Sequence, residues 1–509
     1  MDERREDEVN GAIVAGKRSF SASFVACLFL WLLPAVAEEV EANRQAPDRP
    51  NIVLILADDL GYGDVRCYNP DSQVVTPHMD RLAREGIRFT NAYAPAAVCH
   101  PSRYGLLTGR YPFRAEMNWR ERSLIAEERM TIGSLLRKHE YITACIGKWH
   151  LGFDRGVEYD CSRPLAGGPI GRGFDHYFGI PASLDIPPYF YIRQDRCVAA
   201  PTRTIEDSVE PGLTSRVHGR FWRAGKSAPD FRHDDVLDRL TDEAVAFLRK
   251  HRRQSPDRPF LLYFSLTAPH TPWVPGERFR GRSPIGAYGD FLTHTDDAIG
   301  RVLTTLDELR LAAGEETLVI VTSDNGPLWF EPDIECHGHR ATHVFRGLKG
   351  DIWEGGIRVP FIARWPGRIP ARSTSDEVVG LVDCLAMFAA IVGEELPDDA
   401  GEDSVDILPA LLGRKLDRPL REALLLQSNR GDRIAIRQGP WKLIPWLGGG
   451  GFLNPPAFVE PVEGGPLGQL YHLDDDPAER HNLYQKHPDV VERLSKLLEG
   501  SEQPGRNRR

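Results

Sequence analysis

The sequence Asn51-Ile-Val-Leu-Ile-Leu-Ala-Asp-Asp59 decides the fold. Its apolar part is short and rich in β-branched side chains, the pattern of a strand that is buried on both faces. Three further runs, at residues 141–146, 260–266 and 317–322, have the same pattern. Amphipathic helical patterns lie between the runs, at 233–251 and 288–311. This alternation predicts an α/β protein, with a large mixed, mostly parallel sheet flanked by helices.

The chain changes character near residue 413. Short β-rich runs are separated there by turn sequences such as Asn429-Arg-Gly-Asp432, and one amphipathic helix follows near 490–498. We expect a main domain at 48–412, a smaller C-terminal antiparallel sheet plus helix at 413–500, and a disordered tail at 501–509. Residues 155–232, with clustered Gly, Pro, Tyr and Arg, are expected to be loop-like.

The first residues have the features of an export signal. Lys17-Arg18 precede an apolar run at 24–33, and Ala35-Val-Ala37 is a small-x-small cleavage sequence. We expect residues 1–37 to be a signal peptide and 38–47 a linker, with no stable membrane insertion after cleavage. A single membrane anchor is the alternative, but the run is short for a bilayer span. The prediction is an exported protein in a periplasmic, secreted or equivalent oxidising setting.

The charge balance and the cysteine count limit the classes of function that fit this sequence. The 509 residues include 63 Lys and Arg against 73 Asp and Glu, a net charge of −10, which argues against general nucleic-acid binding. Eight cysteines become seven after cleavage, so at least one thiol is left over in an oxidising compartment. Cys161 and Cys197 could pair, although the sequence alone does not fix connectivity.

Polar residues follow each of the four buried runs. In an open parallel sheet, ligands bind beyond the carboxyl ends of the strands. Asp and Asn oxygens are ligands for a hard cation, Ca²⁺ or Mg²⁺, and Lys and His side chains beside that cation could surround an anion. The residues in question are Asp58, Asp59, Lys148, His150, His270, Asp324 and Asn325. A competing zinc site at His337, His339 and His343 lacks a fixed helical or Cys-x-x-Cys frame.

The leftover cysteine stands in Cys99-His-Pro-Ser-Arg103, before a helix expected to begin near Ser102. Cys99 could be a small buried residue. A cysteine at a helix N-terminus beside Arg103 would instead have a lowered pKa and be reactive. The helix N-terminus also favours a bound anion.

This element, with Leu106-Leu-Thr-Gly-Arg110, resembles the signature of the type I sulfatases, the arylsulfatase family of the alkaline phosphatase superfamily. The resemblance runs from about residue 48 to 500. Supporting motifs occur in the family's order: Asp58-Asp59, Gly147-Lys-Trp-His-Leu-Gly152, Ala268-Pro-His270, Ser323-Asp-Asn-Gly326, Phe345-Arg-Gly-Leu-Lys-Gly350, Trp353-Glu-Gly-Gly-Ile-Arg-Val-Pro360 and Leu470-Tyr-His-Leu473 with Asp476-Pro477.

The resemblance implies a mechanism. A separate maturation enzyme would convert Cys99 to formylglycine during export. One hydroxyl of the hydrated aldehyde would attack sulfur and form a covalent sulfo-enzyme, and the other would expel sulfate. A divalent cation, Ca²⁺ or Mg²⁺, would activate the attacking hydroxyl.

The resemblance also implies roles for the matching residues. Asp58, Asp59, Asp324, Asn325 and the modified Cys99 would bind the cation. Arg103 would hold the formylglycine hydroxyl, His150 would act as a base, and His270 would assist the leaving oxygen. Lys148 and Lys349 would contact the sulfate, and Ser183 would support the site.

Three functions follow as hypotheses. The first is an exported sulfatase acting on a sulfated small molecule or glycan, with Tyr189-Phe-Tyr191 and nearby arginines in 155–232 either lining a sugar pocket or packed in an ordinary loop. A phosphodiester or phosphonate monoester hydrolase of the same superfamily is the second. The third is a non-catalytic sulfated-glycan binding protein, disfavoured because every expected polar position is filled.

Overall fold

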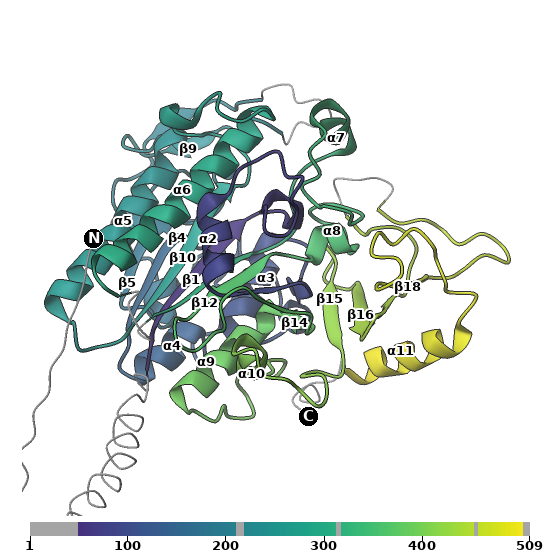
Figure 1. Ribbon diagram of the computed structural model, residues 1–509. Coiled ribbons are helices and arrows are strands. Elements are labelled where there is room, and N and C mark those ends of the chain that lie inside the picture. Colours follow the sequence, from purple (N-terminus) through teal and green to yellow (C-terminus); the bar gives the residue numbers. More distant parts are fainter. Residues whose placement is uncertain (1–48, 210–217, 312–316, 452–456, 502–509) are drawn as a thin grey trace, which may run out of the picture. The chain divides into compact units, whose positions relative to one another are not determined.

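The computed structural model describes residues 49–209, 218–311, 317–451 and 457–501, all within one compact unit, Asp48–Arg509 (Figure 1). The expected signal peptide, the linker and most of the tail lie outside the described residues. Ser501, which was expected in the tail, is instead the last residue of a helix. Among the described residues, no helix is long and apolar enough to cross a membrane.

The main sheet confirms the α/β prediction. Its ten strands, counted over the described residues, are ordered β13-β2-β12-β11-β1-β10-β4-β5-β6-β7. The four expected runs are its central parallel strands, β1 (Asn51–Asp58), β4 (Ile142–Lys148), β10 (Phe260–Pro269) and β11 (Thr317–Ser323). The remaining strands are β2 (Ile87–Phe89), β5 (His176–Ile180), β6 (Ile192–Arg193), β7 (Arg196–Cys197), β12 (Phe361–Arg364) and β13 (Ser373–Ser375).

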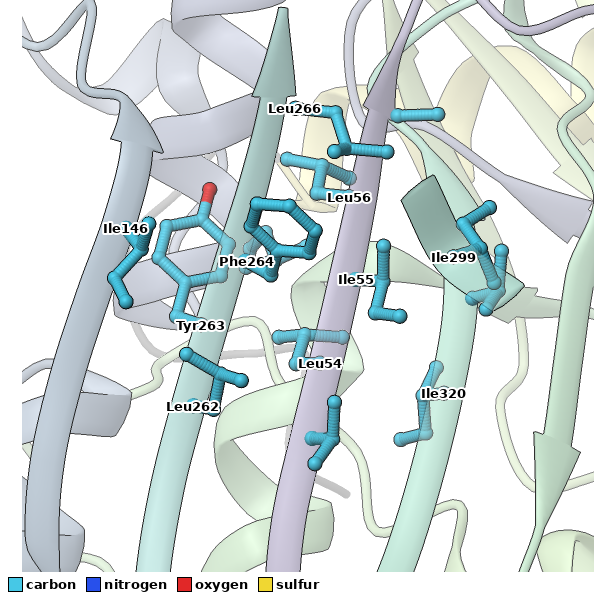
Figure 2. Close-up of a cluster of buried hydrophobic side chains, with 14 of the residues drawn as sticks. Leu54, Ile55, Leu56, Ile146, Leu262, Tyr263, Phe264, Leu266, Ile299 and Ile320 are labelled. Carbon is cyan, nitrogen blue, oxygen red and sulfur yellow. The ribbon is translucent and has the colours of Figure 1, made fainter. Parts of the chain in front are cut away.

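The apolar runs form the core because both faces of the sheet are covered. In β1, Ile52 pairs with Leu261 on one side and Leu318 on the other, and residues 52–57 are at most 1% exposed. Figure 2 shows Leu54, Ile55 and Leu56 interleaved with side chains of β10, β11 and Ile299 of the helix α6 (Gly286–Glu308). Burial of these side chains is the main stabilising contribution to the sheet.

The helices form two groups, one on each side of the sheet (Figure 1). One group contains the two expected helices, α5 (Val236–Gln254) and α6, with α2 (Pro77–Glu85). The other contains α3 (Cys99–Thr108), α4 (Ile132–Lys138), α9 (Cys384–Val392) and α10 (Leu408–Leu411). The short α7 (Glu331–His337) and α8 (Glu354–Ile357) come between β11 and β12 in the sequence.

Short elements complete this body. A two-stranded sheet pairs β3 (Ala92–Tyr93) with β14 (Val379–Gly380). The 3₁₀ helices are η1 (Tyr62–Asp64), η2 (Pro112–Arg114), η3 (Pro169–Arg172), η4 (His233–Asp235), η5 (Glu277–Phe279) and η6 (Leu381–Asp383).

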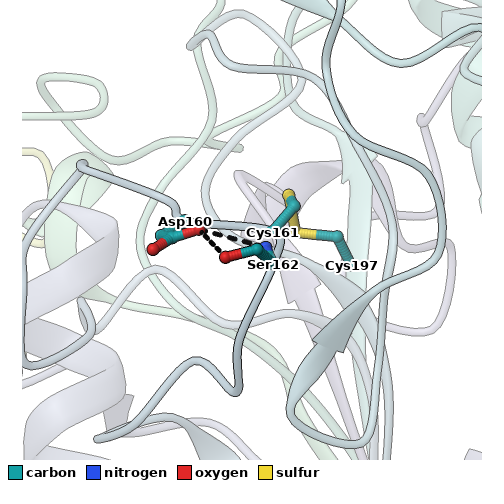
Figure 3. The surroundings of a disulfide bond; sticks show 4 residues. All are labelled: Asp160, Cys161, Ser162 and Cys197. Carbon is teal, nitrogen blue, oxygen red and sulfur yellow. Dashed lines mark hydrogen bonds between the residues drawn. A yellow bond between two sulfur atoms is a disulfide. The ribbon is translucent and has the colours of Figure 1, made fainter.

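The described residues of 155–232 contain more strands than expected. They contribute β5, β6 and β7 to the main sheet, and β8 (Arg203–Ile205) pairs with β9 (Gly225–Ser227) in a separate ribbon. A disulfide joins Cys161 to Cys197, so the pairing considered from sequence is present (Figure 3). It ties the loop near Ser162 to the end of β7.

The C-terminal region forms the expected antiparallel sheet, in the order β15 (Leu424–Gln427), β16 (Ile434–Gln438), β17 (Trp441–Ile444) and β18 (Gln469–His472). The helix α11 (Pro488–Ser501) packs against it (Figure 1). The Ala97 N–H donates to the Gln427 carbonyl, so this sheet contacts the segment before Cys99. The domain boundary near residue 412 stays a prediction.

Candidate active site

Two neighbouring parallel strands deliver the acidic residues. Asp58 ends β1 and Asp59 follows it in a left-handed conformation (φ 63°), while Asp324 and Asn325 follow β11. The Asn325 amide donates to Asp59 Oδ1 at 2.7 Å, and the Asp59 N–H donates to Asp324 Oδ1 at 3.2 Å. None of the four is more than 1% exposed. The sheet edge therefore brings together the oxygen ligands expected from sequence.

Two buried lysines face these carboxylates. Lys148, the last residue of β4, places Nζ 2.7 and 2.9 Å from the two oxygens of Asp58. Lys349 places Nζ 2.7 Å from Asp59 Oδ2. Gly147 allows this register, because a Cβ at that position would lie 1.7 Å from the Ser265 carbonyl oxygen, with φ at 121°. The positive charges lie where an anionic ligand would meet the carboxylate cluster.

Cys99 begins α3, three residues earlier than the start expected at Ser102. The Ser102 hydroxyl donates to the Ala96 carbonyl at 2.7 Å, and Pro101 occupies the first turn, where its missing N–H costs no helical hydrogen bond. Cys99 Sγ lies 3.3 Å from His150 Nδ1. Burial raises the pKa of the Cys99 thiol, but the nearby Lys148 and His150 outweigh it and hold that pKa well below the usual value. The side chain is 7% exposed, so it is a reactive group at the edge of the core.

His150 lies beside this sulfur. Burial lowers its pKa to about 4, so the imidazole is neutral near pH 7. The residue is in a left-handed conformation (φ 56°), and its Nε2 is buried with no hydrogen-bond partner among the described residues. β4 ends at Lys148, so the backbone between Lys148 and His150 is not a continued strand. A buried unpaired nitrogen beside a reactive sulfur is available to a ligand.

Arg103 contacts the acidic cluster directly. Its Nε donates to Asp324 Oδ2 at 2.8 Å, and a second guanidinium nitrogen lies 2.7 Å from the same oxygen. A third nitrogen donates to the Ser265 hydroxyl at 2.5 Å. The side chain is fully buried, so it fixes the orientation of Asp324.

The two carboxyls nearest Cys99 shift in opposite directions. Burial raises the pKa of Asp58, but Lys148 and His270 outweigh it, and the net pKa is well below the ordinary value. Burial and the charge of Asp58 raise the pKa of Asp324 despite Arg103. Asp58, Cys99 and Asp324 offer ligand atoms within 4.8 Å of one another. Asn325 Oδ1 is buried without a hydrogen-bond partner among the described residues. An orphaned amide oxygen beside repelling carboxylates fits a hard cation.

The competing histidine site is not formed. Among the described residues, the groups of three or more candidate ligands include none of His337, His339 and His343. His339 Nε2 instead lies 2.8 Å from Asp64 Oδ1 in the core. The zinc alternative is therefore not supported.

His270 and Ser183 are the outer members of the expected set. His270 Nε2 lies 3.7 Å from Asp59 Oδ2, so it joins the cluster. Ser183 is buried, and its hydroxyl has no partner among the described residues. Ser183 lies two residues after Pro181, and the Pro181 carbonyl accepts a hydrogen bond from the His150 N–H at 3.0 Å.

Sequence reasoning missed three residues that shape the site. The Ser265 hydroxyl accepts from Arg103 and donates to the Lys148 carbonyl at 2.6 Å, so it links the two residues. Its signal is a serine inside an otherwise apolar strand. His100 and Trp119 lie against His150, with ring centroids at 5.5 and 4.7 Å. His100 was visible as the residue after Cys99, whereas Trp119 has no motif around it.

Comparisons with known proteins identify the family of this chain. The Sulfatase family model matches residues 50–394. The chain is 35% identical to an N-acetylgalactosamine-6-O-sulfatase of Bacteroides thetaiotaomicron, covering 92% of this chain and 97% of that protein. It is 34% identical to human arylsulfatase A, covering 88% and 87%. A solved structure, described under metabolism of multiple glycosaminoglycans by Bacteroides thetaiotaomicron, superposes with a TM-score of 0.78 at 33% identity and covers 89% and 99% of the two chains. The chain therefore belongs to the sulfatase family of the alkaline phosphatase superfamily and is a sulfuric ester hydrolase.

Proposed function

We propose that this protein is an exported sulfatase that removes a sulfate ester from a sulfated carbohydrate, with a 6-sulfated N-acetylgalactosamine as the first substrate to test. The observation that carries the proposal is the buried cluster of Cys99, His150 and the Asp58–Asp324 pair at the carboxyl edge of the sheet. The choice of sugar comes from the relative that is matched over 97% of its length.

Position 99 supplies the nucleophile in this proposal. Formylglycine formed from Cys99 provides, as its hydrate, an oxygen nucleophile and a second hydroxyl for release of sulfate. The Cys99 sulfur occupies the position of that oxygen, so the 3.3 Å contact places His150 Nδ1 within reach of a proton at this side chain. Arg103 donates to Asp324 and so fixes the orientation of this carboxylate.

The oxygen ligands fit a divalent cation. Asp58, Asp59, Asp324 and Asn325, with the modified Cys99, would hold Ca²⁺, or Mg²⁺, and the cation would offset their mutual repulsion while polarising a sulfate oxygen. Asn325 Oδ1 supports this role because it has no hydrogen-bond partner among the described residues, while its amide nitrogen donates to Asp59.

The sulfate group would be held by cations and neutral donors. Lys148 and Lys349 turn their ammonium groups toward the carboxylate cluster and would contact sulfate oxygens. His270 would donate a proton to the leaving alcohol oxygen when the sulfur–oxygen ester bond breaks. Ser183, with its unpaired hydroxyl, would support His150 or the sulfate.

Export and maturation complete the proposal. Residues 1–37 would direct export and be removed, so that secreted material begins near Glu38, and a formylglycine-generating enzyme would read Cys99-His-Pro-Ser-Arg103. N-terminal sequencing that still finds residues 24–33 in the mature protein would contradict cleavage.

A substrate panel tests the function. Turnover would be compared for galactosamine 6-sulfate, glucosamine 6-sulfate, sulfated algal oligosaccharides, an aryl sulfate and an aryl phosphate diester, with Cys99→Ala as the inactive control. We expect sulfate esters to be hydrolysed and the 6-sulfated galactosamine to have the highest kcat/KM. Faster hydrolysis of the phosphate diester would favour the phosphodiesterase alternative. Binding of every sulfated sugar without turnover by formylglycine-containing protein would favour a binding function.

A further inference from the structure

A pocket outside the candidate active site carries an unbalanced positive charge. It has a volume of about 350 Å³ and lies between α2, β2, β13 and the loop that follows η1. Four arginines line it: Arg66, Arg84, Arg88 and Arg372. Asp80 is the single acidic residue in its lining. We call this cavity the arginine pocket.

The four guanidinium groups have no carboxylate partner among the described residues. Arg66 donates to the Ser72 carbonyl and Arg88 to the Thr374 hydroxyl, both neutral acceptors at 3.4 and 3.3 Å. Glu85, at the end of α2, is already paired with Arg81 and Arg364. Four positive groups therefore face one carboxylate in a protein whose net charge is −10.

The lining residues are also arranged for contact with a solute. Arg66, Arg84 and Arg372 are exposed, and Arg372 is held in a left-handed conformation (φ 58°) just before β13. A non-glycine residue in this region carries a conformational cost, and such residues cluster at ligand sites. Guanidinium groups bind sulfate and carboxylate groups through paired hydrogen bonds.

The arginine pocket lies at the β13 side of the main sheet, where β12 and β11 separate β2 from β1. The loop with Arg66 follows η1, which follows Asp58-Asp59. In the same loop, the Tyr68 hydroxyl donates to the Phe361 carbonyl at 2.8 Å, and Phe361 pairs with Thr322, two residues before Asp324. A glycan held at the catalytic site would have to extend across the width of β11 and β12 to reach the pocket.

We propose that the arginine pocket is a second anion-binding site that holds a sulfate or carboxylate group on a distant residue of a sulfated oligosaccharide. This inference rests on the proposed function, because it takes the substrate to be part of a longer anionic glycan. The pocket gives longer chains extra affinity and leaves the monosaccharide sulfate unaffected. Its contribution is electrostatic, so it weakens as salt rises.

Binding measurements without turnover test the proposal. In the Cys99→Ala protein, calorimetry would measure the Kd of a sulfated glycosaminoglycan hexasaccharide, of galactosamine 6-sulfate and of inorganic sulfate. The test variant carries Arg84→Gln and Arg372→Gln. The matched control carries Arg137→Gln and Arg252→Gln, two exposed arginines on α4 and α5 with the same change in charge. Because all four are exposed, both variants should fold, and thermal unfolding would verify it.

We expect the test variant to raise the hexasaccharide Kd about five-fold or more, with a smaller dependence of affinity on salt, and to leave the monosaccharide Kd unchanged. The control should match the parent. An unchanged hexasaccharide Kd, an equal loss in the control, or a loss confined to inorganic sulfate would overturn the proposal. A failed substrate panel would refute the proposed function instead, because these affinities are measured without turnover.

Discussion

Replacing Asp324 by Asn tests whether the carboxylate cluster is built around a cation. The side chain is fully buried and contacts Arg103 at 2.7 Å, while its ligand oxygen lies within 4.8 Å of one from Asp58. Asparagine keeps the volume and one oxygen and removes one negative charge. The change therefore separates the electrostatic role of Asp324 from its packing.

Two opposing effects set the stability of the metal-free variant. Two unit charges no more than 4.8 Å apart repel by at least roughly 3–4 kcal/mol at an effective dielectric constant of about 20, and the substitution relieves this repulsion. Losing one partner of the buried Arg103 pair costs about 3–5 kcal/mol, less whatever the amide oxygen retains. We expect the free energy of unfolding in chelator to change by only about 1–2 kcal/mol, because the two effects largely cancel.

Ca²⁺ should stabilise the wild type more than Asp324→Asn. At a concentration 100-fold above its Kd, Ca²⁺ stabilises the wild type by about 2.7 kcal/mol. The variant should show little stabilisation at that concentration and about 10²–10³-fold lower kcat. Denaturant unfolding with and without Ca²⁺ measures the first, and turnover of an aryl sulfate measures the second.

The matched control is Asp383→Asn, which alters another fully buried aspartate paired with an arginine, Arg421. It should lose stability equally with and without Ca²⁺. If Ca²⁺ stabilised Asp324→Asn as much as the wild type, the reasoning would be refuted.

Three further predictions concern other parts of the chain. Lys349→Met should lower kcat/KM for sulfate esters about 10–100-fold, because it removes a charged contact to the sulfate. The control Lys226→Met, which changes an exposed lysine in β9, should not, and equal kinetics for the two variants would contradict the role of Lys349. Replacing both Cys161 and Cys197 by Ser should lower the free energy of unfolding by about 3–4 kcal/mol, given a separation of 36 residues, and unchanged denaturant unfolding would argue that the bond does not constrain the unfolded chain. Burial raises the pKa of Asp296 to about 7, above its unfolded value. The folded state therefore binds more protons than the unfolded state between about pH 4 and 7, and the free energy of unfolding falls as pH rises through that window. Asp296→Asn should remove this loss, worth up to roughly 4 kcal/mol, and parallel pH profiles of unfolding for variant and wild type would count against it.

The central strands and the acidic part of the site could be predicted because their signals are local. β1 and β11 are continuous apolar runs that end in acidic residues, and parallel strands bring such ends to one edge. The ion pairs between the lysines and these carboxylates required the register of β4, which the sequence pattern does not specify.

Other features depend on tertiary contacts. β5 spans five residues with a glycine inside, and it becomes a strand because β4 pairs with it. α3 begins at Cys99 because Ser102 bonds backwards to Ala96, a contact that the helical pattern does not reveal. The arginine pocket gathers residues from four separate segments, so no motif marks it.

The most direct test of the central claim is the chemical state of position 99 in active protein. Tryptic digestion should release the peptide from Phe89 to Arg103, and its mass should show an aldehyde in place of the thiol, reactive toward hydrazines. The fraction of this peptide that carries the aldehyde should rise with turnover of an aryl sulfate when a formylglycine-generating enzyme is co-expressed. Full activity from protein in which Cys99 is entirely a free thiol would contradict the account.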